Sequence, residues 1–214
     1  MMMQKAITGL KPQKSNPNRV NLYLDGEFVF GIPATSAQDL QIGDSLSETQ
    51  LAELHDSVQL GNAYQAALHY LSYCPRTRKE LEDRLSRKGI PENIVTVVVD
   101  RMDEMGMVSD AIFTKLWLES RSLSRPKSHR MLRHELQQKG VAPEIIEDGI
   151  GFMEDDETLA HRALEMRSRR WQGLEKQRFY SLAAGFLGRR GFSYQIIRKV
   201  LDEYWQVNFE NMDN

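Results

Sequence analysis

The sequence lacks the features on which disulfide bonding, membrane insertion and secretion depend. Its single cysteine, Cys74, excludes an intramolecular disulfide and a cysteine-based zinc site, and it is typical of a reducing compartment, for which we expect the cytoplasm. No apolar run approaches the length of a membrane-spanning helix, and the first ten residues lack the long apolar stretch of a signal peptide. We therefore expect a protein that has no contact with membranes.

Motifs for catalysis and nucleotide binding are equally scarce. The sequence contains no G-x-G-x-x-G, no G-x-x-x-x-G-K-[ST] and no G-x-S-x-G, and the glycines of 188-GRRGF-192 match a helix end rather than a phosphate loop. The five histidines show no metal-ligand spacing such as H-E-x-x-H. We therefore expect a protein that is not an enzyme and that has neither a cofactor nor a metal site.

The charge is nearly balanced overall but uneven along the chain. Lys and Arg number 28 against 30 Asp and Glu, so the net charge is −2, unlike a protein that grips free DNA over its whole surface. Residues 120–143 nevertheless carry Glu135 as their only acid among several basic residues, and residues 166–178 combine basic residues with Trp171. Such runs are most often solvated helix faces, but arginine also suits bidentate pairing with carboxylates or phosphates.

The first 46 residues have the pattern of a small sheet. An Asp25-Gly26 pair joins the alternating segments 20-VNLYL-24 and 27-EFVFGI-32, which predicts a β-hairpin. An earlier strand is expected near residues 5–12, with a loop at 13–18, so that three or four short strands form the sheet. A helical stretch near 35–40 and a turn at Gly43-Asp44 complete the module. Ser47 and Gln50 then predict the capping box of a connecting helix over 47–60.

From about residue 48 onward the hydrophobic period is that of helices. In 78-RKELEDRLSRKG-89, Leu81 and Leu85 share one helix side, Thr77 and Glu80 have the form of a capping box, and Gly89 suits a helix end. The segment 94-IVTVVVD-100 has the β-branched composition of a strand, but its apolar stripe continues past strand length, which favours a helix.

A repeat organises this helical region. Gly89, Gly140 and Gly191 lie at equal intervals of 51 residues (140 − 89 and 191 − 140), each after a basic residue and before an apolar one. Leu85, Leu136 and Leu187 stand four residues before them. The pattern predicts a mainly α protein with three tandem three-helix repeats in an elongated curved array, preceded by the β-containing module. The predicted segments are 1–46, 47–60, 61–108, 109–153, 154–207 and a C-terminal tail at 208–214.

The chain resembles the RecX family, the regulatory proteins of the RecA recombinase, in three stretches that occur in the family's order: 66-AALHYLSYCPRTRKELEDRLSRKGI-90, 110-DAIFTKLWLESRSLSRPKSHRMLRHELQQKGV-141 and 189-RRGFSYQIIRKVL-201. The N-terminal part is similar to the β-containing extension of some members. The chain departs from the family pattern at 126-PKS-128, where a glycine is usual and Ser128 can serve as N-cap, and at Ser109-Asp110, which replaces an acidic pair.

The resemblance implies a non-enzymatic modulator, chiefly an inhibitor, of RecA. Such proteins bind in the groove of the RecA filament on single-stranded DNA and limit its growth, ATPase activity and strand exchange. We expect this filament, with the single-stranded DNA inside it, to be the partner of a monomeric chain, with free DNA as a weaker ligand. The basic residues that we predict to contact the filament are Arg121, Arg125, Lys127, Arg130, Arg133, Arg167, Arg169, Arg170, Arg78 and Lys79.

Two other functions fit the same pattern. A direct DNA-binding protein with helix-turn-helix-like repeats also combines three-helix units with a basic helix, although the net charge argues against it. A peptide-binding helical scaffold requires a large apolar groove, and the sequence shows no surplus of apolar residues outside the core positions of the repeats.

Overall fold

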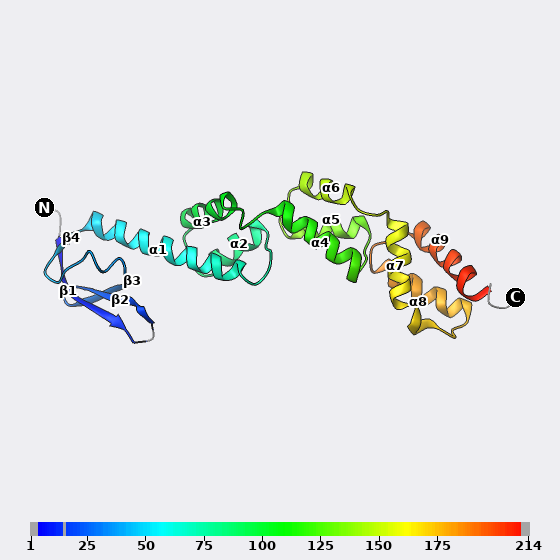
Figure 1. Ribbon diagram of the computed structural model, residues 1–214, viewed down its shortest axis with the longest axis horizontal. Coiled ribbons are helices and arrows are strands. Elements are labelled where there is room, and N and C mark those ends of the chain that lie inside the picture. The colour runs from blue at the N-terminus through cyan, green and yellow to red at the C-terminus, as the bar shows by residue number, and fades with distance from the viewer. Residues whose placement is uncertain (1–3, 15, 211–214) are drawn as a thin grey trace. The chain divides into compact units, whose positions relative to one another are not determined.

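The computed structural model describes residues 4–14 and 16–210, and within this part the chain is mainly helical with a small antiparallel sheet at its N-terminal end (Figure 1). Two compact units can be distinguished by packing. The first contains the residues up to Tyr73 together with Arg84–Arg101, and the second contains Cys74–Asp83 together with the residues from Met102 onward. None of the helices in the described part is long and apolar enough to cross a membrane.

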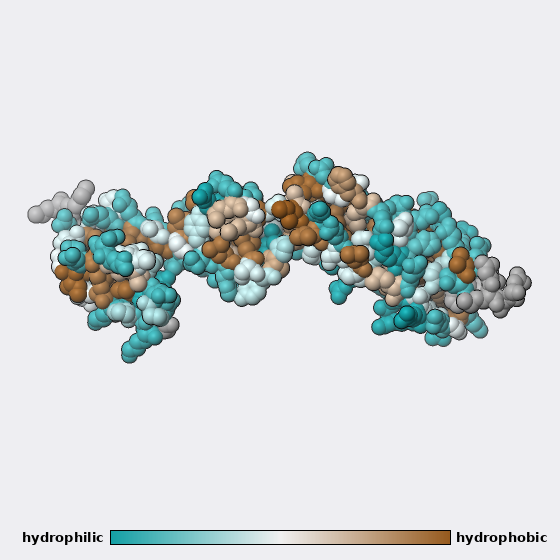
Figure 2. Space-filling model, viewed as in Figure 1, coloured by the Kyte–Doolittle hydropathy of each residue, from teal (hydrophilic) through white to brown (hydrophobic). Residues whose placement is uncertain are grey.

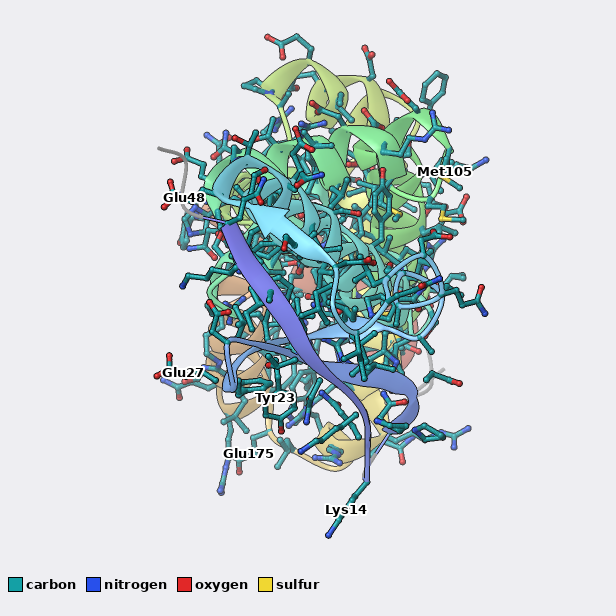
Figure 3. The ribbon with its side chains drawn as sticks, turned by 90° about the vertical axis from the view of Figure 1, so that its left-hand side faces the viewer. Lys14, Tyr23, Glu27, Glu48, Met105 and Glu175 are labelled. Atoms are coloured by element: carbon teal, nitrogen blue, oxygen red, sulfur yellow. The ribbon has the colours of Figure 1, made fainter. Side chains whose placement is uncertain are left out.

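The sheet of the first unit has the strand order β3-β2-β1-β4 and is antiparallel throughout. Its strands are β1 (Gln4–Gln13), β2 (Asn16–Leu24), β3 (Glu27–Pro33) and β4 (Ser45–Ser47). Asp25 and Gly26 join β2 to β3 with φ values of 49° and 88°, as a two-residue hairpin turn of this kind requires, so the predicted hairpin is confirmed. Lys14 follows β1 and projects away from the sheet (Figure 3).

The sheet has four strands, within the predicted three or four, but two details of this module differ from prediction. Residues 34–39 form turns where a helical stretch near 35–40 was predicted, because the segment is too short and too polar to bury a helix face. The three-residue strand β4 forms an edge of the sheet by pairing with Gln4–Ala6. Its position could not be predicted from local sequence, because the strand depends on this pairing with a segment about 40 residues earlier. Ser15, in the predicted loop 13–18, and residues 211–214 of the predicted tail lie outside the described residues.

Helix α1 (Glu48–Leu71) runs without interruption through the predicted connecting helix 47–60 and the first helix of the first predicted repeat. Its predicted capping box is confirmed, since Ser47 and Gln50 exchange side chain to backbone hydrogen bonds. Gly61 does not end the helix, because a single interior glycine costs only about 1 kcal/mol relative to alanine. The domain boundaries placed near this residue stay predictions.

The helices α2 (Arg78–Ser86) and α3 (Glu92–Glu104) follow. The Thr77 hydroxyl accepts from the Glu80 amide at 3.1 Å, and the Glu80 carboxylate accepts from the Thr77 amide at 3.2 Å, which confirms the second capping box. Leu81 and Leu85 are fully buried. The β-branched segment inside α3 is helical as predicted, since Val95, Val98 and Val99 are buried on one side of the helix.

The second unit contains two further groups of three helices. The first group consists of α4 (Asp110–Ser124), α5 (His129–Gln138) and α6 (Pro143–Gly151), which share a core that includes Phe113, Leu136 and Ile146. The second group consists of α7 (Asp156–Ser168), α8 (Lys176–Gly188) and α9 (Tyr194–Trp205), with a larger core that includes Trp171 and Phe179. Short helical turns, η1 (Arg169–Trp171) and η2 (Gln206–Glu210), follow α7 and α9.

Successive groups contact each other through their second helices, α2, α5 and α8. The residue just before one second helix binds the turn that follows the second helix of the next group. The Thr77 hydroxyl donates to the Lys139 carbonyl at 2.7 Å, and the Ser128 amide donates to the Arg190 carbonyl at 3.0 Å. Ser128 also caps α5 as predicted, since its hydroxyl accepts from the Met131 amide at 3.3 Å. Both carbonyls immediately precede a glycine of the 51-residue series, so the repeat positions also form the joints.

The glycines at these joints are required for two reasons. Gly140 and Gly191 have φ values of 81° and 87°, in the left-handed region that favours glycine. A Cβ atom at Gly140 would lie 2.5 Å from the Lys79 Cβ, and one at Gly191 would lie 2.6 Å from the Ser128 Oγ. Gly89 has a φ of 77°, but a Cβ atom there would have no described atom within 4 Å. The predicted helix-end role is therefore common to all three, whereas close contact with the preceding group belongs only to the second and third.

Candidate functional site

Three of the predicted contact residues are held by carboxylates within the group α4–α6. The Arg121 Nε donates to the Glu135 Oε2 at 3.1 Å, and Lys127 forms an ion pair with the other oxygen of the same carboxylate. Glu135, the only acid in residues 120–143, thus binds two of the cations that surround it in the sequence. Arg133 makes a bidentate pair with Glu147 at 2.7 and 2.8 Å, and this hydrogen bonding raises the pKa of Arg133.

The two residues predicted in the first repeat differ from each other. Arg78 pairs with Glu82 at 3.1 Å and with Asp103 at 3.7 Å. Lys79 is exposed, and its aliphatic stem lies against Gly140 at the joint. The Glu80 carboxylate of the same helix binds Lys139, 59 residues away.

The half-buried Glu135 of α5 makes a pH-dependent contribution to stability. Burial acts to raise the pKa of Glu135, but hydrogen bonds from Lys127 and Arg121 outweigh it, so the pKa lies below its ordinary value. A carboxyl whose pKa is lowered by folding stabilises the folded state above its unfolded pKa of about 4.3, and this contribution is lost as the pH falls through the lowered value.

We therefore expect Glu135→Gln to lower the free energy of unfolding by about 1–3 kcal/mol at pH 7, and the difference from wild type to shrink steadily below about pH 4.3. The measurement is urea unfolding followed by tryptophan fluorescence at several pH values. Glu119→Gln, an exposed change in the middle of α4, provides the control and should have little effect at any pH. A Glu135→Gln difference that stays constant with pH would contradict the role of this carboxylate.

Three other predicted residues lie together without a carboxylate. We call them, with two neighbours, the arginine cluster: Arg125, Arg130, Arg167, Arg189 and Arg190. Arg125 ends α4, Arg167 lies near the end of α7, and Arg189 and Arg190 follow α8. Within residues 4–14 and 16–210, no Asp or Glu side chain forms an ion pair with any of the five.

The cluster is built around the ring of Phe186 and the joint at Gly191. The Arg190 guanidinium carbon lies 3.6 Å from the centre of the Phe186 ring, and that of Arg167 lies 5.4 Å from it. One Arg130 nitrogen donates to the Gly191 carbonyl at 3.4 Å. The ring and the carbonyl hold these side chains in place, so the positive charges are positioned before any ligand binds.

The electrostatics of the cluster favour an anion. Burial lowers the pKa of Arg190, and so do the positive charges of Arg167, Arg189 and Arg125. The buried Arg190 Nε has no hydrogen-bond partner among the described residues. Like charges gathered without acids repel one another, and a phosphate or carboxylate bound between them would relieve this repulsion.

The remaining predicted residues, Arg169 and Arg170, are exposed on the turn η1 and lie outside the cluster as defined. Arg189 and Arg190 were not predicted as site residues, because 188-GRRGF-192 was interpreted only as a helix end. A signal was present, since this copy of the repeat has two arginines before its glycine where the second copy has glutamine and lysine.

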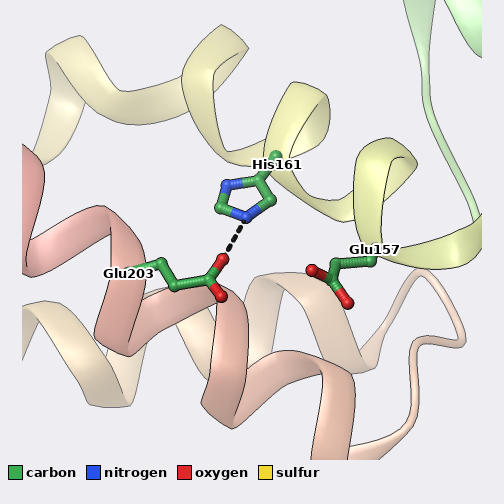
Figure 4. Close-up of side chains that lie close together, drawn as sticks. All are labelled: Glu157, His161 and Glu203. Atoms are coloured by element: carbon green, nitrogen blue, oxygen red, sulfur yellow. Dashed lines mark hydrogen bonds and ion pairs between the residues drawn. The ribbon is translucent and has the colours of Figure 1, made fainter.

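A separate group of side chains links α7 to α9 (Figure 4). The ligand atoms of Glu157, His161 and Glu203 lie within 4.8 Å of one another, close enough to hold a metal ion. The Lys199 ammonium, however, lies 2.6 Å from Glu157 and 3.9 Å from Glu203, where it already neutralises both carboxylates. His161 also hydrogen-bonds to Glu203 at 2.8 Å. The i,i+4 spacing of Glu157 and His161 was missed in the sequence, and the group acts as an ion-pair network between helices.

Comparison with known proteins places this architecture in a family. Family models match residues 5–46 as the regulatory protein RecX N-terminal domain, 63–102 as the first three-helix domain of RecX, and 109–150 as the second. The regulatory protein RecX of Bacillus pumilus is 27% identical over 211 residues, which cover 97% of this chain and 80% of that protein. The regulatory protein RecX of Streptomyces lividans is 32% identical over 142 residues, or 64% of this chain and 76% of that protein.

Solved structures agree with the sequence matches. A crystal structure of regulatory protein RecX is similar with a TM-score of 0.64 and 25% identity, covering 92% of this chain and 99% of that one. RecX from Lactobacillus salivarius is similar with a TM-score of 0.58 and 25% identity, covering 68% of this chain and 96% of that one. The N-terminal sheet and the two helical domains are matched in sequence, and most of the chain is matched in structure: the protein belongs to the RecX family.

Proposed function

We propose that the protein regulates RecA by binding the RecA filament on single-stranded DNA and limiting its growth, ATPase activity and strand exchange. The observation that carries this proposal is the arginine cluster, which gathers five positive charges without a carboxylate on a chain of the RecX family. The role is regulatory rather than catalytic, and its place is the cytoplasm, where RecA acts.

The arginine cluster is a better candidate for contact with an anionic partner than the basic stretch at residues 120–143. Arg121, Lys127 and Arg133 of that stretch are already paired with carboxylates. Arginine binds phosphate or carboxylate oxygens through two parallel hydrogen bonds, and the guanidinium planes can also stack on bases. The net charge of −2 confines such contact to a local surface. This suits a partner in which DNA is already covered by protein, rather than a protein that must capture bare DNA.

The helical architecture also suits a filament. We propose that α7–α9 form a third repeat after the two matched domains, since Gly191 and the Ser128 joint repeat the features of Gly140 and the Thr77 joint. Three tandem repeats in an elongated, curved, monomeric arrangement would follow a filament groove over several subunits.

The direct test is the ATPase activity of RecA on single-stranded DNA with increasing amounts of this protein. We expect the rate of ATP hydrolysis to fall in a concentration-dependent manner, because the filament that carries the activity stops growing. A rate that stays unchanged at a molar excess of the protein would contradict the proposal.

Direct DNA binding is the second candidate, because an arginine cluster without acids can also contact the phosphates of bare DNA. A salt titration separates the two functions. Tight binding to DNA without RecA, with a steep loss of affinity as salt rises, would favour the direct DNA-binding protein. Weak binding to bare DNA combined with strong inhibition of RecA favours the filament.

A further inference from the structure

An open apolar groove of about 840 Å³ lies between α4 and α6. Leu118, Ile145 and Met153 form part of its wall. Two further lining residues are strongly exposed: Phe152 retains 93% of its accessible surface and Leu123 retains 74%. Figure 2 shows apolar side chains at the surface over this pair of helices. The sequence was interpreted as having no surplus of apolar residues outside the core positions, and this interpretation was wrong. The exposed apolar residues of the groove lie at helical spacings that resemble core positions.

The third helical group closes the same place with charged side chains. The buried residues Phe113 and Leu118 of α4 correspond to the buried Leu159 and Leu164 of α7, and Ile146 of α6 corresponds to Ile197 of α9, which sets the register between the groups. In this register the positions of the network in Figure 4 can be compared directly with those of the groove.

Residue differences at four positions leave the groove open in α4–α6 and bridge the helices in α7–α9. In α7 and α9, Glu157 pairs with Lys199 and His161 pairs with Glu203, so polar side chains bridge the two helices. In α4 and α6 no ion pair joins the corresponding residues of the described part. The four corresponding residues, in the same order, are Ala111, Asp148, Lys115 and Phe152. The groove is thus a difference between otherwise similar groups, and its apolar surface lacks the covering that the same fold provides elsewhere.

The charges at the rim restrict what can cover the groove. Glu119 and Asp148 line it and are exposed, with no ion-pair partner among the described residues, whereas Lys115 is the only base of the lining. The third acid of the lining, Glu154, is held by Arg162. An acidic rim repels phosphate groups, so neither DNA nor an anionic lipid surface fits. It attracts a ligand that carries a basic group beside its apolar side chains.

A second copy of this chain does not meet that requirement through its own exposed phenylalanine. Phe152 is followed closely by the acids Glu154, Asp155 and Asp156. Insertion of Phe152 into the groove of another copy would bring these acids next to Glu119 and Asp148, and like charges at close range disfavour association.

We propose that the groove between α4 and α6 binds a segment of a partner protein that presents apolar side chains at helical spacing beside a lysine or arginine. Burying an exposed phenylalanine and leucine supplies the affinity, and the acidic rim selects the basic segment. This surface is distinct from the arginine cluster, so the chain has one surface for an anionic partner and another for an apolar, basic one.

The test uses the full-length protein and two fluorescent helical peptides, one with leucines on one face and lysines on the other, and one with glutamates in place of the lysines. Fluorescence anisotropy should show that the leucine and lysine peptide binds at least about tenfold more tightly than the glutamate peptide. Phe152→Ser should weaken binding of the lysine peptide by at least about tenfold, because the exposed ring would no longer be buried on binding.

Two further variants sharpen the result. Tyr194→Ser removes an aromatic ring that is 76% exposed outside the groove, and it should leave peptide binding unchanged. The double change Ala111→Glu with Asp148→Lys copies the ion pair of the third group and should weaken binding as Phe152→Ser does. Absence of binding, equal binding of both peptides, or equal loss in Tyr194→Ser and Phe152→Ser would overturn the proposal. Self-association in sedimentation that Phe152→Ser abolishes would also overturn it, in favour of a second copy. None of these outcomes depends on RecA.

Discussion

Gly191→Ala is expected to destabilise the second unit by about 2–4 kcal/mol. Alanine in the left-handed conformation costs about 1–2 kcal/mol, and the new Cβ would lie 2.6 Å from the Ser128 Oγ and 3.0 Å from the Met131 Cβ. The Ser128 hydroxyl must then move from its capping position, and loss of an N-cap costs about 0.5–2 kcal/mol. Urea unfolding followed by tryptophan fluorescence measures the effect, because Trp117, Trp171 and Trp205 all belong to this unit.

The matched control is Gly106→Ala in the same unit. Gly106 has a φ of 67°, but a Cβ atom there would have no described atom within 4 Å. This change should therefore cost only the conformational term, about 1–2 kcal/mol. Equal destabilisation by the two substitutions would show that the close approach of Gly191 to Ser128 does not contribute to the loss of stability.

Reversing three arginines of the cluster, Arg125→Glu, Arg167→Glu and Arg189→Glu, is expected to weaken binding to the RecA filament by a factor of at least about 10³. Charge-assisted hydrogen bonds contribute about 1.5–3 kcal/mol each, and the reversed charges add repulsion. If the contacts are to phosphates, the dependence of log affinity on log salt should also fall by about three units. Arg190 is left in place, because it stacks on Phe186 and belongs partly to the core.

The control reverses the same amount of charge elsewhere. Lys5, Lys14 and Lys88 are exposed lysines far from the cluster in the sequence, and changing them to glutamate alters the net charge equally. Circular dichroism should remain close to wild type in both triple variants. If the two variants bind the filament equally well, the position of the charge is irrelevant and the cluster is not the contact surface.

The secondary structure was predictable where local chemistry decides it. The capping boxes at Ser47 and Thr77 and the left-handed glycine at Gly89 involve residues at most a few positions apart, so the sequence alone specifies them. The helix at residues 92–104 was also predictable, because its apolar stripe outweighs its β-branched composition. The strand β4 was not, since it exists only through its partner strand.

The candidate site was predictable only in part, because ion pairs depend on the tertiary structure. A count of charges along residues 120–143 treats Glu135 as one acid, but it lies where it accepts from Arg121, Lys127 and Trp117 together. Arg133 is similarly paired with Glu147 of the next helix. Of the residues first predicted, Arg125, Arg130 and Arg167 reach the arginine cluster.

The joint positions at the two ends of the series of helical groups differ from those between the groups. Gly89 has a left-handed φ like Gly140 and Gly191, yet a Cβ atom there would have no described atom within 4 Å. At the other end, the N-cap residue of α8 is Glu175, whose side chain makes no capping hydrogen bond, in contrast to Thr77 and Ser128. A duplicated copy of α7–α9 appended after α9 would meet Glu175 at the position where Thr77 and Ser128 form the two earlier joints. The three second helices thus share a left-handed glycine after their C-termini but differ in the residue that precedes their N-termini.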